Sequence, residues 1–472
     1  CLDFFLPASK VVDAAEILFK EFNFDIYPAF VSWYNDILVD LDSQLGLDSG
    51  SLTDGTGSYK GFNRIIRPFI GGSAGSVDYT RVAEDNVPVG HNLVTRDEII
   101  INSIVCQLKF GAITDFGFRT SEKSDGSLKI DGYKGGYPTS NFEIPEQIDG
   151  KNVTEISPFA FLSLDKSNIT SITIPDTIKE IGAYAFSGFA EVTDITISTA
   201  SVLEEISEGA FCDCKKIIKI TLPNSLKKIT PTAFMGCDAL TSIAVTEGNA
   251  VFSGNAGILY NKNGTTLIYC PLGKNIDSGL NLDNAVTEIG AMAFYGHKNL
   301  SSINLNNVTL IREEAFFGCI NLTSIVGTQV RIIEKAALFN TKWLNDQLTA
   351  NIDYISIGTA LYSYMGNATD VDLSAYTNVS EGAFMANHTI ENITFGNNML
   401  NIGSFAFYDC ENLQNVYLNN NNNVIYVGMG SFDKNSANRN LHIPKTLQSQ
   451  YEENELWQQY ELTVHQTNIV FD

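Results

Sequence analysis

The dipeptide Ala-Phe recurs at nearly constant spacing through the second part of the chain. Between residues 160 and 407 most copies follow one another after 22 to 25 residues, with two wider steps of 60 and 68 residues. The copies are Ala160-Phe161, Ala185-Phe186, Ala210-Phe211, Ala233-Phe234, Ala293-Phe294, Ala315-Phe316, Ala383-Phe384 and Ala406-Phe407. The degenerate Ala337-Leu338 divides the wider step of 68 residues. A period in this range predicts a repeat architecture.

Other apolar positions fall into register when the dipeptides are aligned. Eight of them recur 48 residues later with the same character: Ile172, Ile174, Ile178, Ile181, Ala185, Phe186, Phe189 and Val192 match Ile220, Leu222, Leu226, Ile229, Ala233, Phe234, Cys237 and Leu240. The alternation from Ile172 to Ile174 predicts a short strand with two side chains inward and one outward. Pro175 then ends the strand because it lacks a backbone donor. The stretch from Glu180 to Phe189 predicts a short helical or turn segment.

One such unit is too small to bury its apolar face alone. Stacked on its neighbours, with strands about 4.8 Å apart, it contributes to a continuous core. The pattern predicts about ten to eleven units between Phe142 and the C-terminus.

Residues 172 to 192 carry a recognisable signature in Ile174-Pro175, Ile181-Gly182 and Ala185-Phe186. This pattern resembles the leucine-rich repeats of the BspA-like family of bacterial surface proteins, over about residues 128–460. The resemblance implies an α+β repeat fold, a right-handed leucine-rich-repeat solenoid whose short strands stack in a curved sheet. It also implies a non-catalytic, adhesin-like role at the surface of a bacterium.

The repeat pattern divides the chain into three predicted regions. Residues 126–440 form the repeat array, with insertions at 246–274 and 340–370. The first predicts a β-hairpin with a turn at Asn263-Gly264, and the second contains the strand-like stretch from Tyr354 to Tyr364. The resemblance implies that both are inserted hairpins that extend the sheet. Residues 441–472 are expected to cap the open end of the core, because terminal repeats are atypical. Residues 1–125 match no repeat and predict a separate mixed domain of unknown fold, helical between Lys10 and Phe22 and between Ala29 and Leu45.

Charge and hydropathy exclude some partners. The chain has 54 acidic and 30 basic residues, a net charge of −24, so its field repels nucleic acid and anionic lipid surfaces. No apolar run reaches the roughly 18 to 20 residues that a membrane span needs. Cys1 is a candidate lipid-attachment residue, because a bacterial lipoprotein begins at such a cysteine after signal cleavage. Membrane contact is therefore expected only through such an anchor.

Four of the eight cysteines occupy one position of the repeat, three residues after the Phe. They are Cys214, Cys237, Cys319 and Cys410, and other units place Leu164, Phe189 or His297 there. A position that accepts leucine or phenylalanine is a core position, so we expect buried free thiols. A disulfide between Cys214 and Cys237 remains the alternative.

No residue is predicted to be catalytic, to bind a cofactor or to ligate a metal. Gly71 to Gly75 matches the G-x-S-x-G nucleophile motif around Ser73, but no helix is expected to follow, and His91 comes too soon for a hydrolase of that fold. A flexible Gly/Ser loop is the more ordinary interpretation. The five histidines are scattered, and none lies in a His-x-x-x-His or His-Glu-x-x-His motif.

The outward residue of each predicted strand is the candidate ligand face. These residues are Thr173, Thr196, Thr221, Asn304, Asp372, Thr394 and Tyr417. Stacking would align them into a small, polar surface suited to a macromolecular partner, although threonine is also an ordinary exposed strand residue. We therefore expect a secreted or cell-surface protein that binds a protein or glycan of a host or neighbouring cell.

Three alternatives remain open at this stage. The chain could be a structural or receptor-binding component of a larger assembly attached through residues 1–125. A hydrolase could reside in residues 1–125. The array could also be a passive spacer.

Overall fold

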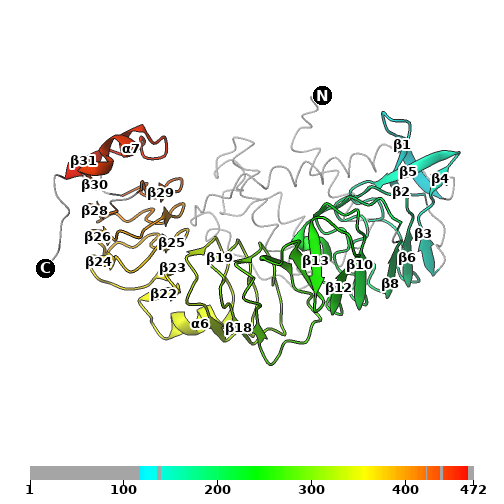
Figure 1. Ribbon diagram of the computed structural model, residues 1–472, viewed down its shortest axis with the longest axis horizontal. Coiled ribbons are helices and arrows are strands. Elements are labelled where there is room, and N and C mark those ends of the chain that lie inside the picture. The colour runs from blue at the N-terminus through cyan, green and yellow to red at the C-terminus, as the bar shows by residue number, and fades with distance from the viewer. Residues whose placement is uncertain (1–116, 135–139, 199, 421–422, 436–438, 466–472) are drawn as a thin grey trace, which may run out of the picture. The chain divides into compact units, whose positions relative to one another are not determined.

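The computed structural model describes residues 117–472 except 135–139, 199, 421–422, 436–438 and 466–472 (Figure 1). The predicted helices before residue 46, the Ser73 motif and Cys1 lie outside these residues. Within the described part of the chain, no helix is both long and apolar enough to cross a bilayer.

A leucine-rich-repeat β-solenoid of about 14 turns begins at residue 128. Most turns contribute one longer strand, and these strands pair in parallel with the strands of the neighbouring turns, as Figure 1 shows for β6 and β8. We call their outward surface the long-strand face. In chain order the strands are β3 (Asn141–Glu143), β6 (Ser171–Ile174), β8 (Asp194–Ile197), β10 (Lys219–Leu222), β12 (Ser242–Val245), β16 (Leu280–Asn281), β18 (Ser302–Asn304), β20 (Ser324–Val326), β24 (Asp370–Leu373), β26 (Asn392–Phe395), β28 (Asn415–Leu418), β30 (Asn440–Pro444) and β31 (Leu462–His465).

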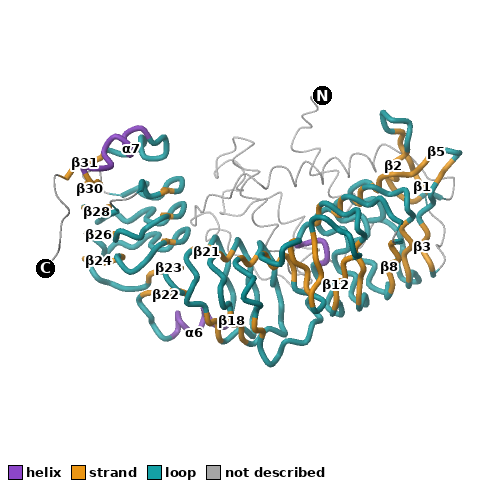
Figure 2. The backbone as a smooth tube through the Cα atoms, viewed as in Figure 1, coloured by secondary structure: helices purple, strands orange, loops and turns teal. Residues whose placement is uncertain are grey.

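A second row of parallel strands, which the sequence analysis did not predict, occupies another side of each turn. Figure 2 shows both kinds of strand separated by turns. We call its outward surface the short-strand face. Its strands, mostly of two residues, are β5 (Lys151–Ile156), β7 (Glu180–Ile181), β9 (Glu205–Ile206), β11 (Lys228–Ile229), β15 (Thr266–Tyr269), β17 (Glu288–Ile289), β19 (Leu310–Ile311), β21 (Ile332–Ile333), β23 (Ala360–Tyr364), β25 (Asn378–Val379), β27 (Asn401–Ile402) and β29 (Tyr426–Val427).

Between the two rows lies a core of stacked side chains. Phe186, Phe211 and Phe234 are fully buried in one cluster. Their rings stack nearly parallel, with centroids 5.5 Å and 5.8 Å apart. The alternating burial of β6, with Ile172 and Ile174 inward, repeats the predicted pattern. The expectation that neighbouring copies share apolar rungs is therefore confirmed.

The segment around most Ala-Phe pairs forms turns, and the one at Ala233-Phe234 forms the short 3-10 helix η2 (Pro231–Phe234). The predicted α+β character of the unit is therefore corrected on this point. Tyr184 and Gly188 have φ values of 55° and 75°, which interrupt a right-handed helix. The amide of Phe186 donates to the carbonyl of Ala210 in the next turn at 2.8 Å, and not to a carbonyl four residues earlier. Backbone hydrogen bonds between turns thus replace a helix.

Both wide gaps in the period contain hairpins that extend the short-strand sheets, as predicted. In the first, β13 (Phe252–Asn255), β14 (Ile258–Asn261) and β15 pair antiparallel, and β15 continues in parallel with β17. The turn between β14 and β15 contains Gly264, at φ 70°. In the second, β22 (Tyr354–Ile357) pairs antiparallel with β23, which continues in parallel with β25. The helix α6 (Lys342–Thr349) precedes it and was not predicted.

Atypical elements lie at the two ends of the solenoid. At the start, β1 (Phe118–Glu122) pairs antiparallel with β2 (Leu128–Tyr133), and β4 (Gln147–Ile148) pairs with β5. At the end, α7 (Gln448–Glu453) follows β30 and carries the buried Tyr451. The indole of Trp457, fully buried, donates to the carbonyl of Ile425 at 2.7 Å. Tyr451 and Trp457 thereby cover the last apolar turns.

Candidate functional site

The predicted ligand residues do lie at the outward positions of long strands. Thr173 is paired with Thr196, and Thr394 is paired with both Asp372 and Tyr417. All seven predicted residues are exposed or half-buried. Backbone pairing keeps equivalent residues on adjacent strands about 4.8 Å apart, so each strand adds one side chain to a row.

The row is divided into segments, and in this it differs from the single face that was expected. The long strands form four hydrogen-bonded sheets: β3-β6-β8, β10-β12, β16-β18-β20 and β24-β26-β28-β30-β31. Two of the breaks coincide with the insertions after β12 and after β20, because each hairpin pairs with the short-strand sheet and leaves its own turn without a long strand. Asn304 therefore lies in a different sheet from Thr173 and from Thr394.

The last sheet carries a ladder of amides that the sequence analysis missed. The Asn392 side-chain amide donates to the Asp370 carboxylate at 2.7 Å, and the Asn415 amide donates to the Asn392 side-chain oxygen at 2.8 Å. His442 Nε2 lies 3.0 Å from the Asn415 side-chain oxygen. The signal was available in the sequence, because these asparagines begin equivalent strands one repeat apart.

Beside the ladder, two rings stack on the long-strand face. The rings of Tyr417 and His442 are nearly parallel, and their centroids are 4.4 Å apart. We call Asn392, Thr394, Asn415, Tyr417 and His442 the amide–aromatic patch. It combines amide donors and acceptors with flat rings, which suits hydroxyl-rich or peptide ligands.

The short-strand face is charged, and its side chains form ion pairs between adjacent turns. Arg312 bridges Glu288 and Glu334 on the adjacent turns, at 2.8 Å and 2.9 Å. Lys228 pairs with Glu205 at 3.1 Å. Partial burial, together with Glu155 and Glu205 on the adjacent strands, raises the pKa of Glu180. This face therefore supplies internal electrostatic contacts between turns, whereas the amide–aromatic patch contains no carboxylate or ammonium group of its own and is flanked by Asp370 and Asp372.

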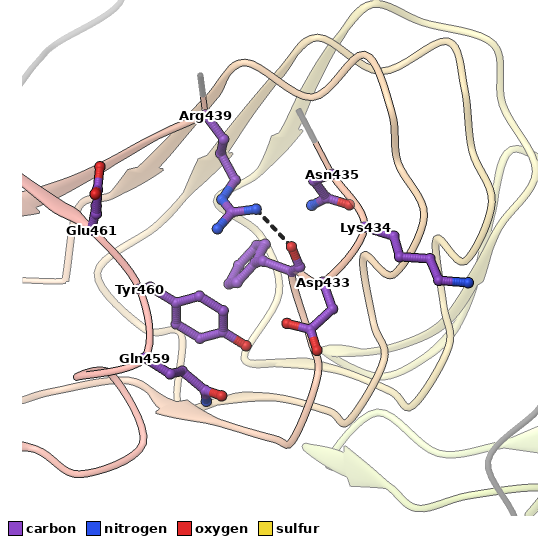
Figure 3. Close-up of a pocket in the computed structure, with 8 residues that line it drawn as sticks. Asp433, Lys434, Asn435, Arg439, Gln459, Tyr460 and Glu461 are labelled. Atoms are coloured by element: carbon purple, nitrogen blue, oxygen red, sulfur yellow. Dashed lines mark hydrogen bonds between the residues drawn. The ribbon is translucent and has the colours of Figure 1, made fainter. Parts of the chain in front are cut away.

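A pocket of about 550 Å³ lies near the C-terminal end (Figure 3). The Arg439 guanidinium carbon is 5.7 Å from the centroid of the Phe432 ring and 5.6 Å from that of Tyr460. Arg439 Nη1 donates to the Phe432 carbonyl at 2.6 Å. Burial lowers the pKa of Arg439, and Tyr460 and Asp433 oppose this shift. These contacts pack the guanidinium between rings and supply no nucleophile–base pair.

The cysteines at the shared repeat position are buried free thiols, as predicted, and Cys214 and Cys237 are not bonded to each other. Each thiol donates to the carbonyl of a Phe in the preceding turn: Cys214 to Phe186, Cys237 to Phe211, Cys319 to Phe294 and Cys410 to Phe384, at 3.0 to 3.4 Å. Burial raises the pKa of Cys319 and of Cys410 to about 12. Thiols in this state are poor nucleophiles and poor metal ligands.

His297 takes the position of these cysteines in its own turn. It is fully buried, and its Nε2 lies 3.0 Å from the carbonyl of Pro271. Burial lowers its pKa to about 4, so the ring is neutral at physiological pH. His297 is therefore a structural residue in the stack.

Similar solved structures are leucine-rich-repeat proteins of bacteria. The pneumococcal vaccine antigen PcpA is 16% identical, with 75% of this chain and 100% of that chain covered and a TM-score of 0.39. A leucine-rich repeat protein from Eubacterium ventriosum is 19% identical, with coverage of 69% and 94% and a TM-score of 0.34. A leucine rich cell surface protein from Faecalibacterium prausnitzii is 20% identical, with coverage of 65% and 94% and a TM-score of 0.26.

Among curated proteins, none matches the chain. The family model of the BspA type leucine rich repeat region matches residues 154–279, 269–359 and 355–455, in six copies. Together these matches cover well over half of the chain and coincide with the solenoid turns described above. The chain therefore belongs to the BspA type leucine-rich-repeat family.

Proposed function

We propose that this protein is a non-catalytic, adhesin-like binding protein of the bacterial cell surface or exterior. Its ligand is a protein or glycan of a host or neighbouring cell, bound on the long-strand face. The observation that carries the proposal is the amide–aromatic patch, where Asn392, Asn415, Tyr417 and His442 are aligned by strand pairing.

The chemistry of the patch supports a broad polar contact. Asparagine amides donate and accept hydrogen bonds at once, so they pair with hydroxyl groups or with a peptide backbone. Tyrosine supplies contact area at a small entropic cost, because it has few rotatable bonds. Side chains already held in place by hydrogen bonds lose less freedom when a ligand binds.

Family membership supports the same assignment. The matching family model describes a leucine rich repeat region of the BspA type. Among the similar structures, one is a pneumococcal vaccine antigen and another is a leucine rich cell surface protein. These descriptions agree with exposure at the cell exterior, which we extend to this chain as part of the proposal.

The test is a binding screen of the full chain on a glycan array and on an array of extracellular host proteins. Hits are then measured with the double variant Asn415→Ala/Tyr417→Ala. The matched control is Lys228→Ala on the short-strand face, whose side chain is 73% exposed. We expect at least a tenfold loss of affinity in the double variant and none in the control.

Two results would count against the proposal. Equal binding by the wild type and the double variant would show that the ligand binds outside the amide–aromatic patch. An absence of binding on both arrays would favour a passive spacer.

A further inference from the structure

Three potential metal ligands meet on two adjacent turns near the C-terminal end of the solenoid. His388 Nε2 lies 3.8 Å from Asp409 Oδ2. One ligand atom each from His388, Asp409 and Glu411 falls within 4.8 Å of the other two. The side chains of His388 and Asp409 are 52% and 35% exposed, so an ion has access from solvent.

The repeat itself brings these residues together. His388 follows Phe384 by four residues, and Glu411 follows Phe407 by four, so the two occupy the same position of successive turns. The amide of Phe384 donates to the carbonyl of Ala406 at 2.8 Å, and the amide of Ala386 donates to that of Tyr408 at 2.9 Å.

Asp409 and His388 are positioned by further local contacts. Asp409 has φ 61°, and its amide donates to the carbonyl of Asp433 at 2.9 Å. The Asn412 side-chain amide donates to the carbonyl of His388. The backbone that carries the three side chains is thus fixed before any ion arrives, which lowers the entropic cost of assembling a site.

We propose that His388, Asp409 and Glu411 bind one divalent transition-metal ion of the zinc class. An imidazole nitrogen with two carboxylates is a donor set that Zn²⁺ accepts in tetrahedral geometry, with a fourth position left for water or a ligand. Ca²⁺ instead takes six to eight oxygen ligands, more than this cluster supplies.

The distances suit such an ion after a small adjustment. Bonds of about 2.0–2.1 Å at tetrahedral angles place ligand atoms roughly 3.4 Å apart. The present 3.8 Å between His388 and Asp409 exceeds this by only a few tenths of an ångström. The Glu411 ligand atom lies within 4.8 Å of the other two, so it must approach by at most about 1.4 Å, which a rotation of this exposed side chain supplies. The ion would link two turns and add a cross-connection between the repeats around Phe384 and Phe407.

One neighbouring cation, Lys434, opposes the binding of a metal ion. Removing its charge therefore provides a variant that should strengthen metal binding and not weaken it. The Lys434 ammonium lies 5.1 Å from the centroid of the Tyr408 ring. Tyr408 precedes the proposed ligand Asp409 in the chain, so this positive charge lies near the cluster. Replacing it by a neutral side chain removes repulsion toward an incoming dication.

The first experiment titrates the full chain with zinc chloride by calorimetry and repeats this with His388→Ala and Asp409→Asn. We expect one equivalent of zinc in the wild type and at least tenfold weaker binding in both variants. Lys434→Ala should bind as tightly as the wild type or more tightly. His442→Ala, which removes a histidine outside the cluster, is the matched control and should bind normally.

The second experiment reads out the bound state. Zinc should raise the unfolding temperature of the wild type and leave that of His388→Ala unchanged, because only a folded site binds the ion. Cobalt bound at the same stoichiometry should show visible ligand-field bands without a thiolate charge-transfer band. Undiminished zinc binding by His388→Ala, or a thiolate charge-transfer band for the bound cobalt, would overturn the assignment. Unchanged circular dichroism of the variants checks that they fold.

Discussion

Replacing Phe211 by alanine tests the physical basis of the solenoid. The Phe211 ring is fully buried and stacks on Phe186 and Phe234, with centroids 5.5 Å and 5.8 Å away. Truncating a buried phenylalanine costs about 3–5 kcal/mol, and each stacked pair adds about 0.5–1.5 kcal/mol beyond area burial. We expect a loss near the upper end, about 5 kcal/mol.

The upper end applies because the turns cannot close over the cavity. The amide of Phe211 donates to the carbonyl of Ala233 at 2.9 Å, and the adjacent short strands β9 and β11 pair through Ile206 and Ile229. These backbone ladders hold the spacing between turns. The cavity left by the Phe211 ring therefore persists, so the variant loses the full cavity contribution to the free energy of unfolding.

The assay is urea unfolding followed by circular dichroism, combined with amide hydrogen exchange. Each repeat contacts only its neighbours, so protection should fall most between residues 172 and 243 and least between 371 and 443. Phe339→Ala is the control, because that ring is 55% exposed and stacks on Phe317 alone among the described rings. We expect it to cost less than about 1 kcal/mol. The reasoning fails if Phe211→Ala costs under about 1.5 kcal/mol, or if protection falls equally in both regions.

Three further predictions concern individual positions of the solenoid. The pKa of His297 is about 4 in the fold and 6.5 in the unfolded chain, so the unfolded state binds more protons between these two pH values. The free energy of unfolding therefore falls by about 3 kcal/mol as the pH drops from 6.5 to 4. His297→Cys should remove this contribution, which urea titrations at pH 4 and pH 7 measure. Gly182→Ala should destabilise the fold strongly, because the new Cβ would lie 2.5 Å from the backbone nitrogen of Pro158. Gly188→Ala should cost only about 1 kcal/mol, because its only penalty is the positive φ. Equal changes in unfolding temperature for the two variants would contradict this reasoning. Cys237→Ala should cost about 1–2 kcal/mol in urea unfolding, because it removes a buried thiol and its hydrogen bond to the Phe211 carbonyl; an unchanged midpoint would show that this contact contributes nothing.

Much of the solenoid could be predicted because its period is short and its core positions are strict. The Ala-Phe spacing located the turns, and the Ile172–Ile174 alternation located β6. The position shared by Cys214, Cys237, Leu164 and Phe189 was predicted to be buried, because a position that accepts leucine or phenylalanine is a core position. Both insertions were predicted to be hairpins, and their antiparallel pairing confirms this.

The unit itself was predicted less well. The segment after Glu180 was expected to be helical or a turn, yet it begins with the two-residue strand β7 and continues as turns. A strand of two residues is too short to show an alternation of apolar and polar residues in the sequence. It forms only because strands of the neighbouring turns pair with it on either side. The left-handed conformation of Tyr184 cannot be seen from its own residue type, although its equivalent in the next turn is Gly209, and glycine is the residue that most readily adopts a positive φ.

The sequence alone determined which side chains point inward, since a unit this small is stable only if its apolar positions recur in register with those of the next unit. Only the tertiary structure decided which polar residues meet. His388 and Glu411 take the same position of successive turns, and so do Asn392 and Asn415, but the period by itself does not show that these side chains meet one another or Asp409. They become neighbours because one turn of the solenoid returns the chain to within a strand's width of its earlier path. Contacts across that distance depend on the offset between turns, which the backbone hydrogen bonds between turns set.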